Sequence, residues 1–220
     1  MSHKNILKLI GCCLESEVHI LVFESVENGT LADRIFRSYE PHFEPLLLAH
    51  RLKIAMELAN AIAYLHFKFP RPIVFRMVDV YSFGVLLLVL LTGLKTHEPP
   101  SWITETRLNW NLEHVVKKYI GARENLLILL TGQRVGCHSG PETEDENLSF
   151  LAFVKKYFGN NRLDEIVDPI IVGDGLCLEE KQKIQAFTEL ALKCASESAE
   201  DRPTMIDVAK QLRQMYCSGM

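Results

Sequence analysis

The segment from Asp79 to Thr92 constrains the fold more than any other part of the chain, because it is apolar on nearly every side of the helix that it would form. Such a helix is stable only where other helices surround it, so we expect it at the centre of a domain. Gly93 marks its end. Its longest apolar run, Phe83–Leu91, is nine residues long, well short of the roughly 18 residues that span a bilayer. The sequence therefore predicts a buried helix and no transmembrane segment.

Apolar periodicity predicts further helices on both sides of this segment. Apolar side chains recur every three or four residues from about residue 45 to residue 67, and the same pattern marks residues 178–195. His66 closes the first of these stripes, where a histidine most often caps helix-end carbonyls. The second half of the chain is therefore expected to be helix and loop.

Two capping boxes locate further helix starts. Thr30 with Asp33 opens a short helix to about residue 36, and Thr204 with Asp207 opens a last helix to about residue 216. At the front, residues 7–14 and 19–23 are typical of two β-strands joined by a polar turn. Such a pair is marginal alone in water, so we expect it to lean on other elements. The fold class is α+β, mostly α.

Charge and cysteine content exclude several classes of protein. The 24 Lys and Arg residues are scattered among 28 Asp and Glu residues, with a net charge of −4, so no basic surface for nucleic acid is expected. The start of the sequence lacks the long apolar core of a secretory signal. We therefore expect the six cysteines to be reduced thiols in a cytoplasmic protein. No C-x-x-C pair is present, and no metal site is predicted.

One stretch of the chain occurs twice. A helix end, a loop and a following helix at about residues 90–121 recur at about residues 129–159, with a one-residue change in offset. The second copy runs directly into residues 163–169, so we expect it to hold the native position. The first copy then needs another place for its apolar residues.

Several motifs resemble those of plant receptor-like protein kinases, and more narrowly those of wall-associated-kinase-like proteins, among which pseudokinases are common. Residues 3–14 look like the end of the kinase αC helix and strand β4, and residues 20–31 look like β5 and the hinge. Residues 51–66 look like αE, residues 79–84 like the start of αF, and residues 194–208 like the αH–αI junction. The implied fold is an incomplete kinase: a helical C-lobe with a remnant β-hairpin of the N-lobe.

The resemblance implies particular domains and site residues. Residues 1–29 correspond to an N-lobe remnant, and residues 30–220 to a kinase-like C-lobe that contains the duplicated segment. The Gly-rich loop, the β3 lysine and most of αC would precede Met1. Phe23, Glu24 and Val26 would be a vestigial hinge that meets adenine, with Phe23 as gatekeeper.

The resemblance also implies an internal deletion after Arg76. Phe75, Arg76 and Met77 stand where the family has His-Arg-Asp, and the Asp-Phe-Gly and Ala-Pro-Glu motifs are absent. No catalytic residue is therefore assigned, since phosphoryl transfer needs a base and carboxylates that hold Mg²⁺.

Three residues match structural positions of the family: Arg76, Asp79 and Arg202. In the family, the aspartate matching Asp79 bonds the backbone of the catalytic loop. The arginine matching Arg202 pairs with the glutamate of Ala-Pro-Glu, which this sequence lacks. A buried arginine without a partner is costly, so we expect Arg202 to turn to solvent or to find another acid, such as Asp201 or Glu197.

Three hypotheses for function follow. The first is a catalytically inactive pseudokinase fragment, acting as a scaffold or partner-binding module in plant receptor-kinase signalling or defence. The second is a serine/threonine protein kinase represented by an incomplete gene model, and the third is an unstable degenerate product. No cofactor is expected, and ATP with Mg²⁺ would be required only if the family function survives. By resemblance, the partners would be receptor kinases or immune receptors, in the cytoplasm or held at the plasma membrane through those partners.

Overall fold

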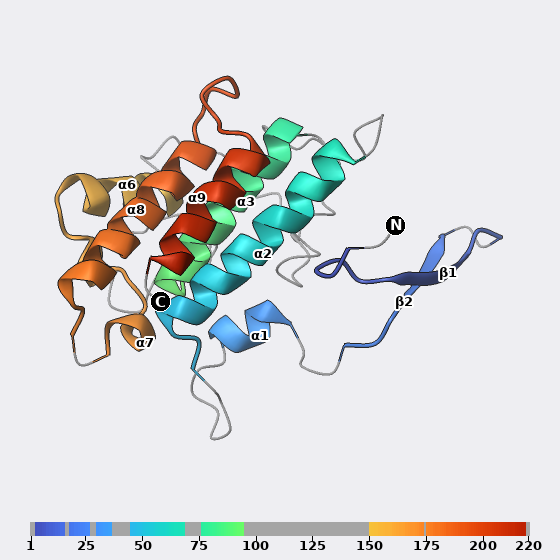
Figure 1. The fold of residues 1–220 in the computed structure, drawn as a ribbon, viewed down its shortest axis with the longest axis horizontal. Helices are drawn as coiled ribbons and strands as arrows, with labels where there is room; N and C mark the ends of the chain where they lie inside the picture. The colour runs from blue at the N-terminus through green and yellow to red at the C-terminus, as the bar shows by residue number, and fades with distance from the viewer. Residues whose placement is uncertain are drawn as a thin grey trace, which may run out of the picture.

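The computed structural model describes residues 3–15, 18–26, 30–36, 45–68, 76–94, 150–173 and 175–218. Its elements are, in order, β1 (Leu9–Cys13), β2 (Ile20–Phe23), α1 (Leu31–Phe36), α2 (Leu48–Phe67), α3 (Arg76–Thr92), α6 (Phe150–Gly159), the 3₁₀ turn η1 (Leu163–Glu165), α7 (Pro169–Val172), α8 (Leu178–Cys194) and α9 (Met205–Cys217). Figure 1 shows a helical bundle beside a two-stranded hairpin. The expected α+β class, mostly helical, is confirmed.

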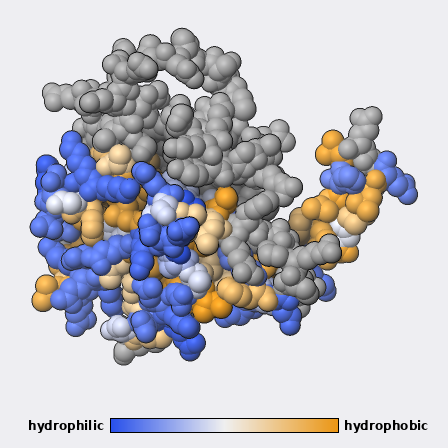
Figure 2. All heavy atoms as spheres, turned by 90° about the horizontal axis from the view of Figure 1, so that it is seen from above, coloured by the Kyte–Doolittle hydropathy of each residue, from blue (hydrophilic) through white to orange (hydrophobic). Residues whose placement is uncertain are grey.

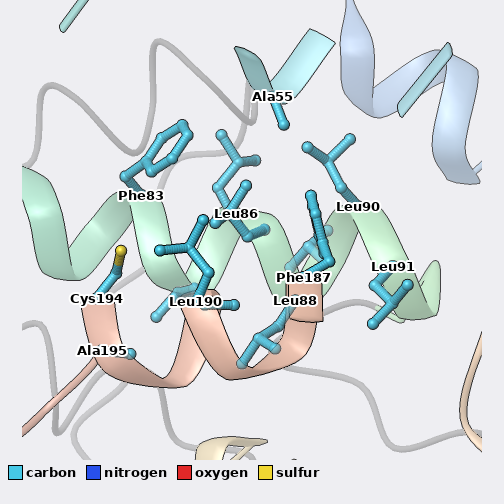
Figure 3. Close-up of a cluster of buried hydrophobic side chains, with 14 of the residues drawn as sticks. Ala55, Phe83, Leu86, Leu88, Leu90, Leu91, Phe187, Leu190, Cys194 and Ala195 are labelled. Atoms are coloured by element: carbon cyan, nitrogen blue, oxygen red, sulfur yellow. The ribbon is translucent and has the colours of Figure 1, made fainter. Parts of the chain in front are cut away.

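Helix α3 lies at the centre of the bundle, as its apolar sequence predicts. It packs against α2 and α8, and α9 packs along α2 (Figure 1). Every residue from Asp79 to Thr92 is buried. Figure 3 shows Phe83 and Leu86 of α3 near Leu190 of α8 in the shared core. Although α3 is apolar, no helix within the described ranges is long and apolar enough to cross a membrane.

Helix starts follow the capping signals in the sequence. Thr30 Oγ1 accepts a hydrogen bond from the Asp33 N–H, and the Asp33 carboxylate accepts one from the Thr30 N–H, both at 3.1 Å. This completes the capping box before α1. Thr204 Oγ1 likewise accepts from the Asp207 N–H at 3.3 Å before α9. Both predicted helix starts are confirmed.

Two other helices begin at positions that differ from the sequence prediction. Helix α2 begins at Leu48 and not near residue 45, and α3 begins at Arg76, before Asp79. The sequence analysis placed the start of this helix at Asp79, because a polar residue directly before an apolar run is typical of a helix start. Asp79 is instead buried within the first turn of α3, where His66 of α2 is its partner.

The front of the chain forms the expected hairpin. β1 and β2 pair antiparallel, with Leu9 opposite Phe23 and Cys13 opposite Ile20. We expected the hairpin to lean on other elements, but it extends away from the helical bundle (Figures 1 and 2). The large apolar side chains of both strands are between 42% and 65% exposed.

Cys194 is the one buried thiol among the described cysteines. It lies at the end of α8 against α3, and burial raises its pKa to about 12. The thiol is therefore neutral at ordinary pH and shielded from reagents, because the thiolate is the reactive form. Cys12, Cys13, Cys177 and Cys217 are exposed.

We expect iodoacetamide at pH 8 to alkylate the four exposed cysteines of the native protein and to leave Cys194 unmodified. Peptide mass spectrometry measures the extent at each position. After unfolding in guanidinium chloride, Cys194 should react as fast as Cys217, which is the internal reference for an accessible helix-end thiol. Rapid native alkylation of Cys194 would show that the α3–α8 contact is open.

Candidate functional site

A buried histidine–carboxylate pair joins the end of α2 to the start of α3. His66 Nε2 lies 2.8 Å from Asp79 Oδ2, and the two residues are only 1% and 5% exposed. The sequence favoured a carbonyl-capping role for His66 and did not predict this partner. The pair fixes the start of α3 against the end of α2.

Arg202 stays inside the protein, which corrects the expectation that it turns to solvent. It is 8% exposed. Its guanidinium donates to the backbone carbonyl oxygens of Ser196, Glu197 and Met77 at 2.8, 3.1 and 2.9 Å. Its Cζ atom also lies 5.0 Å from the centre of the Tyr81 ring.

These contacts explain how Arg202 remains buried. Carbonyl oxygens and an aromatic face stabilise a buried guanidinium, each through its partial negative charge. Arg202 contacts Glu197, one of the two acids expected near it, through the backbone carbonyl oxygen of that residue. Because Met77 and Tyr81 belong to α3, Arg202 ties the loop before α9 to the first turns of α3.

A third buried cluster surrounds Arg51, which the sequence analysis missed. Arg51 is 2% exposed, and its guanidinium donates to the Leu46 and Leu90 carbonyl oxygens, both at 2.7 Å, and to Asp168 Oδ2. Asp168 Oδ1 accepts from the Ile170 N–H at 2.9 Å and so caps α7. This cluster joins α2, the end of α3 and the start of α7.

One sequence signal could have indicated the Arg51 cluster, and the structure explains a glycine beside it. Arg51 falls on the buried face of its helix, next to Leu52, where a charged residue requires a partner. Gly93 has φ +64°, and a Cβ there would lie 2.6 Å from Asp168 Oδ2, so this glycine leaves room for the carboxylate.

The residues expected to form a vestigial hinge, Phe23, Glu24 and Val26, lie at the surface. Phe23 is 42% exposed and Val26 is 53% exposed. The Glu24 N–H donates to the Lys8 carbonyl oxygen, and Glu24 Oε1 accepts from the Lys8 N–H, both at 3.0 Å. Of the three structural positions, Asp79 and Arg202 are in the buried clusters, and Arg76 is the first residue of α3.

The described residues contain no group of three His, Cys, Asp or Glu side chains placed to hold a metal ion. The first copy of the duplicated segment, at about residues 90–121, lies outside the described residues from residue 95 onward, as does the second copy up to residue 149. The end of the second copy forms α6, which buries Phe150, Phe153 and Val154 in the core.

Known proteins that resemble the chain are kinases and pseudokinases. The family model described as protein tyrosine and serine/threonine kinase matches residues 1–70. Wall-associated receptor kinase 1 of Arabidopsis thaliana is 32% identical over 98% of this chain and 30% of its own length. From the same plant, Serine/threonine-protein kinase ZRK1 is 31% identical over 99% of this chain and 66% of its own length. Non-functional pseudokinase ZRK2 is 30% identical over 97% of this chain and 64% of its own length.

Solved structures show the same fold. The pseudokinase domain of BIR2, described as an immune regulator of the RLK/Pelle family, matches with a TM-score of 0.64 and 20% identity, over 99% of this chain and 67% of that one. The pseudokinase DRIK1 matches with a TM-score of 0.56 and 22% identity, over 99% of this chain and 71% of the DRIK1 chain.

The fold is therefore that of a partial protein kinase domain. Within that class, the chain is similar in sequence to wall-associated receptor kinases and to Non-functional pseudokinase ZRK2. The expected resemblance is confirmed. The chain spans 30% of Wall-associated receptor kinase 1 and 52% of Putative wall-associated receptor kinase-like 16.

Proposed function

We propose that this chain is a catalytically inactive, pseudokinase-type module that binds protein partners in plant receptor-kinase signalling or defence. The observation that carries the proposal is the composition of the link between α2 and α3. Residues 69–75 read Phe-Pro-Arg-Pro-Ile-Val-Phe, without a carboxylate, amide or hydroxyl. A kinase needs in this region an aspartate that accepts the substrate proton, and an asparagine and a second aspartate that hold Mg²⁺.

Asp79 is the nearest carboxylate after this link, and its surroundings support the proposal. It is 5% exposed and bonded to His66, so it is poorly placed to bind a metal ion or a substrate hydroxyl. The cationic and metal groups that stabilise a transferring phosphoryl group must be held in a fixed geometry around it. We infer that the chain needs neither ATP nor Mg²⁺ to act, and that the hinge residues Phe23, Glu24 and Val26 are vestigial.

The retained helical lobe supports a binding role. Three buried polar clusters, around Arg51, His66 and Arg202, connect α2, α3, α7 and the loop before α9. They give the bundle a fixed surface in the absence of the catalytic parts. BIR2, which shares the fold, is described as an immune regulator. We infer by analogy that the partners are receptor kinases or immune receptors, met in the cytoplasm or at the plasma membrane.

The first test is phosphoryl transfer by the purified chain. We expect no transfer from γ-³²P-ATP to myelin basic protein, with either Mg²⁺ or Mn²⁺, above the level of a buffer blank. The kinase domain of Wall-associated receptor kinase 1 serves as the positive control. Metal-dependent incorporation that persists at constant specific activity through two further purification steps would overturn the proposed inactivity.

The second test is direct binding. We expect the chain to bind the kinase domain of Wall-associated receptor kinase 1 in calorimetry, with a dissociation constant in the micromolar range that is typical of transient signalling contacts, about 1–100 µM. A kinase domain from outside the receptor-like family is the specificity control. No heat of binding, or equal binding to the control, would overturn the partner assignment for this receptor kinase.

The alternative of an active serine/threonine kinase with an incomplete gene model rests on the relatives that are named as kinases over nearly the whole chain. Sequencing transcripts across the codons for residues 69–79 distinguishes the two. We expect transcripts that join Phe75, Arg76 and Met77 as written here. In-frame codons for the catalytic loop and the Asp-Phe-Gly motif would favour the kinase.

A further inference from the structure

The loop between α8 and α9 exposes a serine side chain that takes part in no contact. Residues 195–204 connect the two helices and project from one end of the bundle (Figure 1). The residues from Glu197 to Asp201 are all exposed. Within the described part of the chain, neither the hydroxyl nor the backbone groups of Ser198 form a hydrogen bond. Ser198 is therefore an accessible hydroxyl on an irregular segment.

The base of this loop is anchored, whereas its middle is held only weakly. Arg202 donates to the backbone carbonyl oxygens of Ser196 and Glu197 at 2.8 and 3.1 Å. Beyond Glu197, the loop is closed by a long backbone hydrogen bond of 3.4 Å, from the Arg202 N–H to the Ala199 carbonyl oxygen. A protein kinase binds its substrate as an extended segment, and a segment with few backbone hydrogen bonds opens at little cost in free energy. The backbone around Ser198 meets that condition.

The charges around Ser198 indicate the class of enzyme that would accept it. Glu197 precedes the serine directly, and Glu200 and Asp201 follow at two and three positions. None of these three carboxylates forms an ion pair or a hydrogen bond with another described residue. The arginine of the loop, Arg202, is buried and bonded to carbonyl oxygens. Such a segment is complementary to a substrate cleft lined by lysine and arginine, and an acidic cleft repels it.

We propose that Ser198 is a phosphorylation site for an acid-directed serine/threonine kinase. In the active site of that kinase, the Ser198 Oγ atom attacks the γ-phosphorus of ATP, and the bond from this phosphorus to the β–γ bridging oxygen breaks. ADP leaves with the electron pair of that bond, and the catalytic aspartate of the kinase accepts the hydroxyl proton. The phosphate adds up to about two negative charges, so residues 196–201 carry about five in place of three.

The test treats the purified full chain with ATP, Mg²⁺ and casein kinase 2, an acid-directed enzyme. Other parts of the chain also carry serine or threonine beside acids, so the measured quantity is the phosphate occupancy of Ser198. Mass spectrometry of the tryptic peptide of residues 194–210 gives this occupancy over time. We expect phosphate at Ser198 with casein kinase 2. The cyclic-AMP-dependent protein kinase, which selects basic segments, should act there roughly tenfold more slowly or less.

Two pairs of variants test the assignment. Ser198→Ala should remove this phosphate, and Ser196→Ala is its matched control in the same loop, where the phosphate at Ser198 should remain. Asp201→Asn should slow phosphorylation of Ser198 roughly tenfold, because the cleft loses a carboxylate partner. Glu179→Gln removes one exposed charge at the other end of α8 and should leave the rate unchanged. Neither Asp201 nor Glu179 has an ion pair to lose, so the fold is kept.

Three results would overturn the proposal. The first is a native chain without phosphate at Ser198 after prolonged treatment. The second is a rate for the native chain more than about a hundredfold below that of a synthetic peptide of residues 194–210, which would show that the folded loop is closed to the enzyme. The third is an equal rate for Asp201→Asn and the wild type, which would show that the neighbouring acids do not direct the kinase.

Discussion

Replacement of Gly84 by alanine is expected to lower the free energy of unfolding by about 3 kcal/mol, near the upper end of the usual cost of overpacking a core. A Cβ atom at this position would lie 2.7 Å from the Ala191 carbonyl oxygen and 2.8 Å from both the Ala195 nitrogen and the Cys194 Cβ. Two of these three atoms are backbone, so no side-chain rotation relieves the clash. Helices α3 and α8 would have to separate along the contact shown in Figure 3.

Thermal unfolding followed by circular dichroism measures this effect. At roughly 2–4 °C per kcal/mol for a chain of this size, the midpoint should fall by about 6–12 °C. Gly159→Ala is the matched control, because a Cβ at the end of α6 meets no atom within 4 Å. Alanine also favours the helix by up to about 1 kcal/mol, so this variant should be as stable as the wild type or slightly more stable.

A change of less than about 0.5 kcal/mol for Gly84→Ala, the level of an ordinary surface substitution, would contradict the close packing of α3 on α8. The same melting experiment addresses the hypothesis of an unstable product. We expect the wild-type chain to unfold in a cooperative transition, and a broad, non-cooperative melt would favour that hypothesis.

Local sequence patterns were sufficient to predict most of the fold. The apolar run after Asp79 predicted a central helix, and α3 has that place because no other environment can cover a helix that is apolar all round. The capping boxes at Thr30 and Thr204 predicted helix starts correctly, since the partners of each box are only three residues apart. Such signals depend on neighbours along the chain.

The buried clusters depend on residues that are distant in the sequence and could not be predicted in the same way. Arg51 and Asp168 are 117 positions apart, and Arg202 and Met77 are 125 apart. Arg202 was expected to turn to solvent or to find another acid, because the resemblance implied that its family partner is missing from the sequence. It is buried, with its guanidinium bonded to carbonyl oxygens of α3 and of the loop before α9, and nothing in the residue types specifies which carbonyl groups point inward.

The second large effect is expected at Arg51. Arg51→Met should lower the free energy of unfolding by about 3–5 kcal/mol, because it leaves the Asp168 carboxylate buried without its cation. The carbonyl oxygens of Leu46 and Leu90 also lose their donor. Urea unfolding measures the change. Arg162→Met is the matched control: the Arg162–Glu165 pair is 57% and 47% exposed, so its loss should change the stability far less.

A double-variant cycle tests whether Arg51 acts through Asp168. Asp168→Asn keeps an oxygen that can accept from the Ile170 N–H, so α7 stays capped while the charge is lost. If the two side chains form one buried pair, Arg51→Met combined with Asp168→Asn should cost less than the two single changes together, by about 1–3 kcal/mol. Strict additivity would mean that Arg51 stabilises the bundle through the backbone carbonyl groups of Leu46 and Leu90, and that the ion pair between α2 and the start of α7 contributes little.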